Sequence, residues 1–128
     1  MTKHNSPLKK DNEKVAYGTH LQLDLIGCSE DIVKNIGYWE RLLKDAANKV
    51  GLKVAAASAQ EVKYAGDLIT VLFETGGYII VQTWIDDKYI SVDGFVRDVT
   101  IDIPNLANHI VDTALPTYME RRIVDRII

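Results

Sequence analysis

Three extended segments, joined by short turns, constrain the fold of this chain more than any other feature. They cover residues 68–73, 78–84 and 89–96 and are rich in β-branched and aromatic residues, which favour strands. Gly76-Gly77 separates the first two, and Asp86-Asp87-Lys88 separates the second from the third. Because connections this short allow only antiparallel pairing, the three segments predict neighbouring strands of one sheet.

Further strands are predicted on both sides of this unit. Residues 20–26 alternate leucines (21, 23 and 25) with polar side chains, which is the period of a half-buried strand. Residues 53–62 are rich in alanine and follow a helix stop, and we expect them to form a strand as well. Residues 118–127 predict a last, ragged strand.

Two helices are predicted between these strands. The first begins after Ser29, a good N-cap, and ends at Gly51, which supplies the left-handed stop. Its apolar stripe recurs every three or four residues: Ile32, Ile36, Trp39, Leu43, Ala46 and Val50. The second opens at Asp102, has Pro104 in its first turn and ends before Pro116.

The element order is therefore β-α-β-β-β-β-α-β. It predicts an α+β sandwich in which an antiparallel sheet carries two helices packed on one face. Residues 1–16 are polar and charged, and we expect a flexible N-terminal tail, with a partner-binding arm as the alternative. Residues 17–128 then form a single domain.

Composition excludes several classes of function. A net charge of −3 gives no electrostatic reason to bind nucleic acid or an anionic membrane. No apolar run is long enough to span a bilayer and no signal peptide is evident, so we expect a cytoplasmic protein. The single Cys28 and three scattered histidines predict neither an internal disulfide nor a metal site.

Short motifs in a consistent order resemble the bacterial S-adenosylmethionine decarboxylase family over residues 17–125. They are Gly18-Thr19-His20-Leu21, Asp24, Gly27-Cys28, Gly66, Gln82-Thr83-Trp84, Tyr89 and Val92-Asp93-Gly94-Phe95. The resemblance implies an enzyme that makes its own cofactor: a Glu-Ser bond breaks, and the serine becomes a pyruvoyl group. That carbonyl forms a Schiff base with the substrate amine and accepts electrons as carbon dioxide leaves.

This chain departs from the family at each residue that such chemistry needs. Counting back from Trp84 places Gly77 at the serine, and a slightly longer turn places Gly76 or Thr75 there. Gln82 stands where the resemblance implies a histidine that assists processing, and an amide does not titrate. Arg97 takes the place of a cysteine proton donor, and its guanidinium stays protonated.

Two further positions bear on ligand binding. Ala59-Gln60 replaces the Phe-His pair that would hold the adenine. Asp86 keeps an acidic group near the family's ribose-binding glutamate. Thr75, which follows Glu74, offers one remaining hydroxyl for an acyl shift, which would leave a ketobutyryl group.

The candidate ligand-binding residues are therefore Asp86, Trp84, Gln82 and Asp93. No catalytic residue, cofactor or metal is assigned, although Glu74 and Arg97 are candidate electrostatic groups. Strand alternation puts Gln82 on one face of its strand and both Asp93 and Arg97 on one face of the next. If those faces coincide, the three residues line one polar pocket or subunit contact.

Structural roles are the simpler interpretation of the same residues. Trp84 is expected to be a core aromatic, and His20 a strand residue with a satisfied hydrogen bond. Asp86-Asp87 is typical of a solvated turn, and Gly76-Gly77 of left-handed turn geometry. An ion pair between Asp93 and Arg97 is expected before a catalytic role.

These observations favour a family member that neither self-processes nor carries a pyruvoyl group. It would be a pseudoenzyme that binds a partner subunit or a nucleoside ligand linked to S-adenosylmethionine or polyamine metabolism. A homodimer, a higher homo-oligomer or a hetero-oligomer with an active homologue is expected, since the family builds dimers. The alternatives are a pyruvoyl-independent lyase acting on S-adenosylmethionine, and an interaction protein that uses an exposed sheet edge.

Overall fold

A single antiparallel sheet with helices on one side makes up the described part of the chain. The computed structural model describes residues 14–61 and 67–128. Its strands are β1 (Ala16–Ile26), β2 (Val54–Glu61), β3 (Leu68–Glu74), β4 (Gly77–Trp84), β5 (Tyr89–Val96) and β6 (Tyr118–Ile127). Its helices are α1 (Glu30–Val33), α2 (Ile36–Lys49) and α3 (Ile103–Ala114), with a short 3-10 turn, η1 (Ile85–Asp87).

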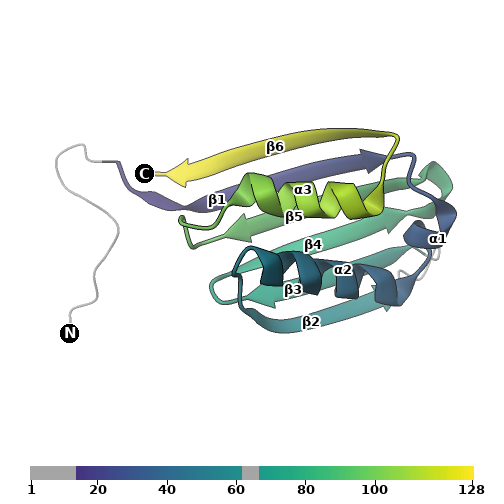
Figure 1. Cartoon of the computed structure of the whole chain (residues 1–128), viewed down its shortest axis with the longest axis horizontal. Helices are drawn as coiled ribbons and strands as arrows, with labels where there is room; N and C mark the ends of the chain where they lie inside the picture. The colour runs from purple at the N-terminus through teal and green to yellow at the C-terminus, as the bar shows by residue number, and fades with distance from the viewer. Residues whose placement is uncertain (1–13, 62–66) are drawn as a thin grey trace.

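The strand order in space is β2-β3-β4-β5-β1-β6, and all neighbours are antiparallel. The three strands joined by short turns are adjacent, as predicted. β1 inserts between β5 and β6, so the first and last strands lie side by side in one half of the sheet (Figure 1). The predicted α+β sandwich, with helices on one face of an antiparallel sheet, is confirmed.

The first predicted helix is interrupted. Asn35 has extended backbone angles (φ −90°, ψ 105°), and its Oδ1 accepts hydrogen bonds from the backbone N–H groups of Gly37 and Tyr38, both at 3.1 Å. The side chain therefore caps a new helix at Ile36, and α1 ends at Val33. The prediction of one continuous helix from Ser29 was wrong because it overlooked Asn35, a strong N-cap inside an apolar stripe.

The second predicted helix is confirmed with its caps. Asp102 Oδ1 accepts a hydrogen bond from the backbone N–H of Asn105 at 3.1 Å, and proline lies in the first turn. Leu115 adopts a left-handed conformation (φ 51°) immediately after the last turn. α3 then leads into β6, which lies outside β1.

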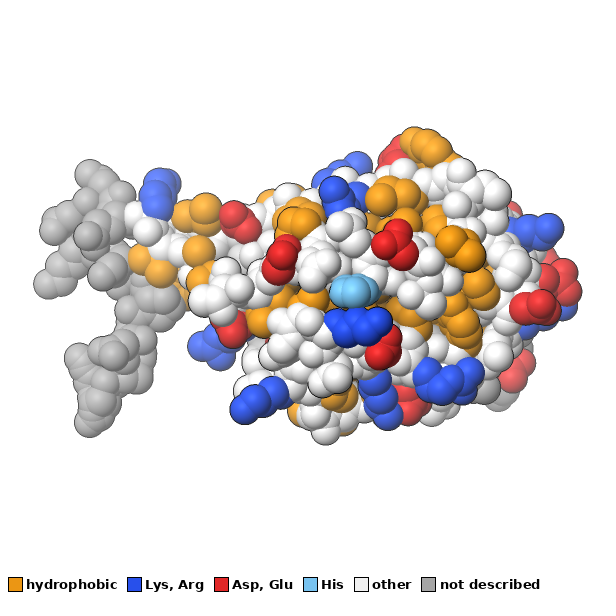
Figure 2. All heavy atoms as spheres, viewed as in Figure 1, with side chains coloured by type: hydrophobic (Ala, Val, Ile, Leu, Met, Phe, Trp, Pro, Cys, Tyr) orange, Lys and Arg blue, Asp and Glu red, His pale blue; other side chains and the backbone are white. Residues whose placement is uncertain are grey.

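The core lies between the helices and the sheet. Alternate side chains of β1, β4 and β5 point into it and meet the apolar sides of α2 and α3. Trp39 of α2 is fully buried, and its indole N–H donates to the carbonyl oxygen of Ile32 at 3.2 Å. Figure 2 shows the outer side of this helix layer, where acidic, basic and apolar side chains are mixed.

Strand limits differ slightly from the prediction. β1 begins at Ala16, four residues before the predicted strand, and the backbone of Val15 pairs with that of Ile128. Most of the predicted tail, residues 1–13, lies outside the described residues, as do Val62 and Gly66. None of the described helices is long and apolar enough to cross a bilayer.

Candidate functional site

The second face of the sheet, on which none of the described helices lies, is called the open face. Directly paired residues of antiparallel strands share a face, so the register defines its members. In its centre these are Tyr78, Ile80, Gln82 and Trp84 of β4; Tyr89, Ser91, Asp93 and Phe95 of β5; His20, Gln22, Asp24 and Ile26 of β1; and Tyr118, Glu120, Arg122 and Val124 of β6. The expected coincidence of the β4 and β5 faces is confirmed.

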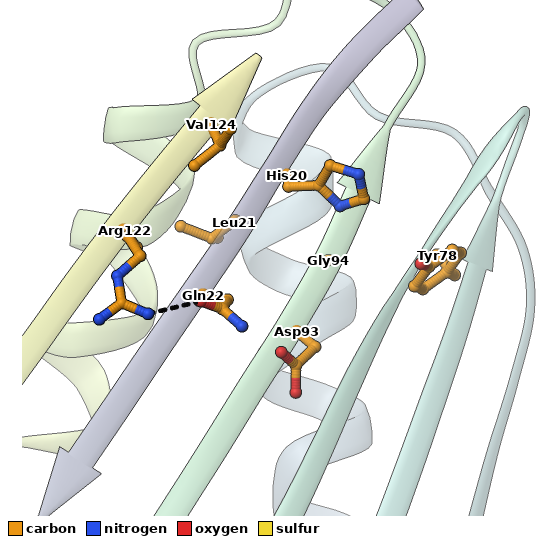
Figure 3. A pocket seen from close by; sticks show the side chains of 8 residues that line it. All are labelled: His20, Leu21, Gln22, Tyr78, Asp93, Gly94, Arg122 and Val124. Carbon is orange, nitrogen blue, oxygen red and sulfur yellow. Dashed lines mark hydrogen bonds between the residues drawn. The ribbon is translucent and has the colours of Figure 1, made fainter. Parts of the chain in front are cut away.

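A shallow trough runs along β1 on this face. Its first hollow, of about 300 Å³, is lined by His20, Leu21, Gln22, Tyr78, Asp93, Gly94, Arg122 and Val124. Figure 3 shows His20, Gln22, Asp93 and Tyr78 projecting to the same side, with the helices behind the sheet. A second hollow of about 40 Å³ shares Gln22 and Arg122 with the first. A third, of about 440 Å³, shares Asp24 and Glu120 with the second, so the three form one trough.

One end of the trough is basic and aromatic. His20 Nε2 lies 3.2 Å from Arg126 Nε, which donates to it, and the two rings of His20 and Phe95 are 4.8 Å apart. The Arg126 guanidinium also lies 5.8 Å from the centre of the Phe95 ring. Arg122 donates to the Gln22 side-chain oxygen at 3.2 Å. The expected satisfied hydrogen bond of His20 is confirmed. Arg122 and Arg126 suit an anionic group, whereas Asp93 in the same hollow suits a cationic one.

The other end is acidic and aromatic. The Tyr89 hydroxyl donates to Asp24 Oδ1 at 2.5 Å, and the Tyr89 ring stacks on Trp84 at 6.0 Å with 19° between the planes. Burial, together with the hydrogen bond to Asp24, raises the pKa of Tyr89 to about 12. Glu120 and Asp87 complete the lining. These groups suit a cationic or planar part of a ligand.

The hairpin between β3 and β4 occupies the position at which the family resemblance implies a self-processing site. Its two loop residues are Thr75 and Gly76, since Glu74 pairs with Gly77. Gly76 has a φ of +102°, which favours glycine. Gly77 starts β4, and a Cβ at this position would collide with the carbonyl oxygen of Phe95 and with Glu74 Oε1. The turn therefore requires glycine at 76 by conformation and at 77 by space.

Glu74 lies on the helix side of the sheet, away from the trough. Its side chain is buried, and Oε1 has no hydrogen-bond partner among the described residues. Burial, with the negative charge of Asp98 nearby, raises the pKa of the Glu74 carboxyl above its ordinary value. Glu74 is thus separated from the predicted ligand residues by the sheet itself.

The predicted polar trio does not form one pocket. Asp93 lines the trough, and Gln82 lies on the same face at a diagonal position, because Gln82 pairs with Ser91. Arg97 lies beyond the end of β5, and its side chain packs beside Gly76. Between Asp93 and Arg97, both described, the structure has no ion pair. That expected pair was wrong, because residues four apart on a strand lie roughly 13 Å apart.

The two remaining candidates lie at the acidic end. Trp84 is 36% exposed, so the expectation of a core aromatic was wrong: its indole lies on the open face against Tyr89. Asp86 is exposed in η1, as expected for a solvated turn, and Asp87 rather than Asp86 lines the third hollow. Asp86 as a ribose-binding group stays a prediction.

Four trough residues were not singled out from the sequence, namely Gln22, Tyr78, Glu120 and Arg122, whereas Asp24 and Tyr89 were quoted as family motifs but not as candidate site residues. Alternation along residues 20–26 and 118–127 gave a usable signal for their shared faces. The alternation did not give the position of β1 between β5 and β6, which brings residues of β1 and β6 to the trough. Among the described residues, no group of three His, Cys, Asp or Glu side chains gathers as a metal site.

Known proteins match this chain both in sequence and in fold. A sequence profile described as S-adenosylmethionine decarboxylase matches residues 19–127. The chain belongs to the S-adenosylmethionine decarboxylase family. The S-adenosylmethionine decarboxylase proenzyme of Clostridium botulinum strain Hall is 32% identical over 78 residues, which are 61% of this chain and 66% of that protein.

More distant relatives extend the match. The proenzyme of Thermodesulfovibrio yellowstonii is 27% identical over 97 residues, covering 76% of this chain and 71% of the relative. The crystal structure of the adenosylmethionine decarboxylase from Aquifex aeolicus superposes with a TM-score of 0.78 over 87% of this chain and 91% of that one, at 17% identity. The decarboxylase-like fold is therefore shared almost throughout, whereas the sequence has diverged widely.

Proposed function

We propose that this protein is a non-processing member of the decarboxylase family that binds a nucleoside ligand on its open face and associates with a second subunit. It is a pseudoenzyme without a pyruvoyl group, and it acts on S-adenosylmethionine or polyamine metabolism by binding. The ligand class is an S-adenosylmethionine-like nucleoside.

The observation that best supports the proposal is steric: any side chain at residue 77 would collide with neighbouring atoms. A serine there would have its Cβ against the Phe95 carbonyl oxygen and Glu74 Oε1. Neither glycine of the turn has a nucleophile, and Thr75, the one hydroxyl in the loop, is exposed. This geometry supports a chain that forms no carbonyl cofactor at Gly76 or Gly77, and Thr75 carries the one hydroxyl of the loop.

The trough supports the choice of ligand. From His20 to Ile26 it follows six residue steps of a strand, which is about 20 Å. Asp93 and Asp24 carry negative charge for an ammonium or sulfonium group, and Arg122 carries positive charge for a carboxylate. Aromatic faces at both ends, from Phe95 and Trp84, offer stacking surfaces for a base.

Calorimetry with S-adenosylmethionine and with methylthioadenosine tests this proposal. Wild-type protein should bind at least one of them, and Asp93→Asn should weaken S-adenosylmethionine binding by about tenfold, the value of one charge-assisted hydrogen bond. Asp112→Asn is the matched control, because Asp112 is also exposed but lies on α3, across the sheet. Asp86→Asn tests the remaining ribose-binding prediction separately.

Absence of heat with both ligands would overturn the ligand part of the proposal. Equal weakening by Asp93→Asn and Asp112→Asn would show a general charge effect and would remove the trough as the site. Chromatography after a long incubation checks the chemistry: the ligand should be recovered unchanged. Conversion to methylthioadenosine would contradict pseudoenzyme status and favour the lyase.

A further inference from the structure

The two outer strands of the sheet, β2 and β6, present different edges (Figure 1). Five of the ten residues of β6 are charged, and charged side chains on an edge strand oppose the addition of a further strand. β2 carries no charge from Val54 to Gln60, and no described strand pairs with its outer side. Its bulge lies at the start, between Val54 and Ala56, and leaves the rest of the edge regular. β2 is therefore the edge that is open to another strand.

The turn between β3 and β4 determines which backbone groups of β2 point outward. Glu74 and Gly77 close a two-residue turn as a hydrogen-bonded pair, so the N–H and C=O groups of Glu74 point toward β4. Direction alternates along a strand, so those of Phe73 point toward β2. Thr75 has the same direction, since its N–H donates to the carbonyl oxygen of Lys53 at 3.1 Å. The pairing of β2 with β3 then leaves three residues of β2 with outward N–H and C=O groups: Ala57, Ala59 and Glu61.

A basic hollow of about 660 Å³ lies beside this edge, between α2 and the start of β2. Its charged lining consists of Arg41, Lys44, Asp45 and Lys53. Lys44 and Asp45 each form an ion pair with a residue one turn away on α2, with N–O distances of 2.9 and 3.4 Å. Arg41 and Lys53 form no ion pair with another described residue. The hollow therefore offers two cationic side chains to incoming carboxylates.

The open side of the same edge is apolar. Phe73 of β3 is 51% exposed there, and its partner in β2 is Ala56, whose single methyl group leaves the ring uncovered. A strand added outside β2 would lie about 10 Å from β3, which is two strand spacings. A large apolar side chain on that strand reaches the Phe73 ring across Ala56. The two sides of the edge therefore suit two different kinds of side chain.

We propose that β2 binds an extended segment of another protein as a further antiparallel strand, in which acidic residues alternate with large apolar ones. The acidic side chains point toward the basic hollow, and the apolar side chains point toward Phe73. A second copy of β2 does not fit this role, because it brings no acidic residue before Glu61. The edge lies apart from the trough, so this binding does not depend on the ligand proposed above.

The direction of the backbone groups decides which residues of the segment form the hydrogen bonds. In antiparallel pairing, the residues opposite Ala57 and Ala59 exchange both hydrogen bonds with them and share their face of the sheet. Ala57 pairs with Leu72, a core residue, so this face is the helix side. The acidic residues of the segment are therefore the ones whose N–H groups bind β2. The N–H groups of its apolar residues point away into solvent.

Backbone methylation of a peptide tests the strand addition directly. The probe is a short fluorescent peptide of alternating glutamate and valine, and its binding to the full chain is followed by fluorescence anisotropy. N-methylation of the glutamates removes the N–H groups that face β2 and should weaken binding by about tenfold or more. N-methylation of the valines is the matched control, with the same composition and charge, and should change the affinity by less than about twofold.

Charge reversal in the hollow tests the chemistry of the partner. Arg41→Glu and Lys53→Glu should each weaken binding of the glutamate-valine peptide by about tenfold. Lys34→Glu is the matched control, because it makes the same charge change on the exposed end of α1, outside the hollow, and should change binding by less than about twofold. A lysine-valine peptide should bind the Arg41→Glu, Lys53→Glu double variant more tightly than it binds wild type.

Four results would overturn the proposal. They are no binding of the glutamate-valine peptide to wild type, equal losses with the two methylated peptides, a loss with methylated valine only, and equal weakening by Arg41→Glu and Lys34→Glu. Equal losses with the two methylated peptides would indicate a general anion site instead of strand addition. Circular dichroism of the variants separates loss of binding from loss of folding. Calorimetry with S-adenosylmethionine on Arg41→Glu separates this proposal from the ligand-binding one, because the trough residues are unchanged.

Discussion

The two faces of the sheet carry different kinds of side chain and have different roles. On the helix side, Leu21, Leu23 and Leu25 of β1 are each at most 1% exposed and belong to the apolar core. On the open side, the alternate residues His20, Gln22 and Asp24 of the same strand carry charge or hydrogen bonds and line a trough. Residues one step apart on the strand thus serve stability on one face and recognition on the other.

The two faces should differ most in what alanine substitutions at adjacent positions of β1 cost in stability. Leu23→Ala should lower the free energy of unfolding by about 3 kcal/mol, because it removes buried methyl groups and leaves a cavity. Gln22→Ala, one residue away on the exposed open face, should cost less than about 0.5 kcal/mol. Urea denaturation measures both. Similar costs would mean that the open face is itself part of a packed core.

A second comparison sets the hairpin glycine against a glycine in open space. Gly77→Ala should lower the free energy of unfolding by about 2 kcal/mol, since the added Cβ meets backbone that cannot move aside. Gly51→Ala is the control: its φ is +84°, but nothing lies within 4 Å of an added Cβ, so it should cost only about 1 kcal/mol of backbone strain. Thermal melts compare them, and equal costs would refute the spatial argument.

Glu74 tests a buried charge on the helix side. Its pKa is raised in the folded chain, so the unfolded chain releases the proton at lower pH than the folded chain does. Stability is therefore lost as pH rises from the ordinary glutamate value through the folded pKa. Glu74→Gln should flatten that fall, and at neutral pH it should gain on the order of 1 kcal/mol relative to wild type. A wild type that becomes more stable over this range would contradict the prediction.

The corresponding substitution on the open face has the smallest expected effect. Asp24→Asn should lower the pKa of Tyr89 from about 12 toward its ordinary value, because a charged acceptor is replaced by a neutral one. Ultraviolet titration, with Tyr89→Phe to identify the tyrosine concerned, measures the shift. The sign for stability follows: a folded pKa above the unfolded one means that stability falls as pH rises beyond about 10. An unchanged titration would leave burial as the whole cause.

Much of the fold was predictable because local chemistry determined it. Alternation, short turns and caps such as Asp102 identified every strand and α3. The break at Asn35 was missed because an apolar stripe continued across a residue that caps from within. Strand order was not available from pattern alone, since the pairing of β1 with both β5 and β6 depends on contacts distant in sequence.

The candidate site was predictable only in part, for the same reason. Asp93 was identified from its strand, but its partners across the trough come from β1 and β6, which local sequence does not place beside it. Trp84 was expected in the core because large aromatics usually are buried, whereas here it stacks on Tyr89 at the surface. Gly76 was correctly linked to left-handed turn geometry, whereas Gly77 lies in β4 without a positive φ, and its obstruction required the neighbouring strand β5.

The central claim is that this decarboxylase-family chain does not cleave itself, and its intact mass tests that most directly. Denaturing mass spectrometry of purified, aged protein should show one species at the full chain mass of 14.4 kDa. Gly77→Ser should also remain one species, because a single hydroxyl is added to a turn built for glycine. Two fragments from the wild-type chain, divided near residues 74–77, would contradict the account.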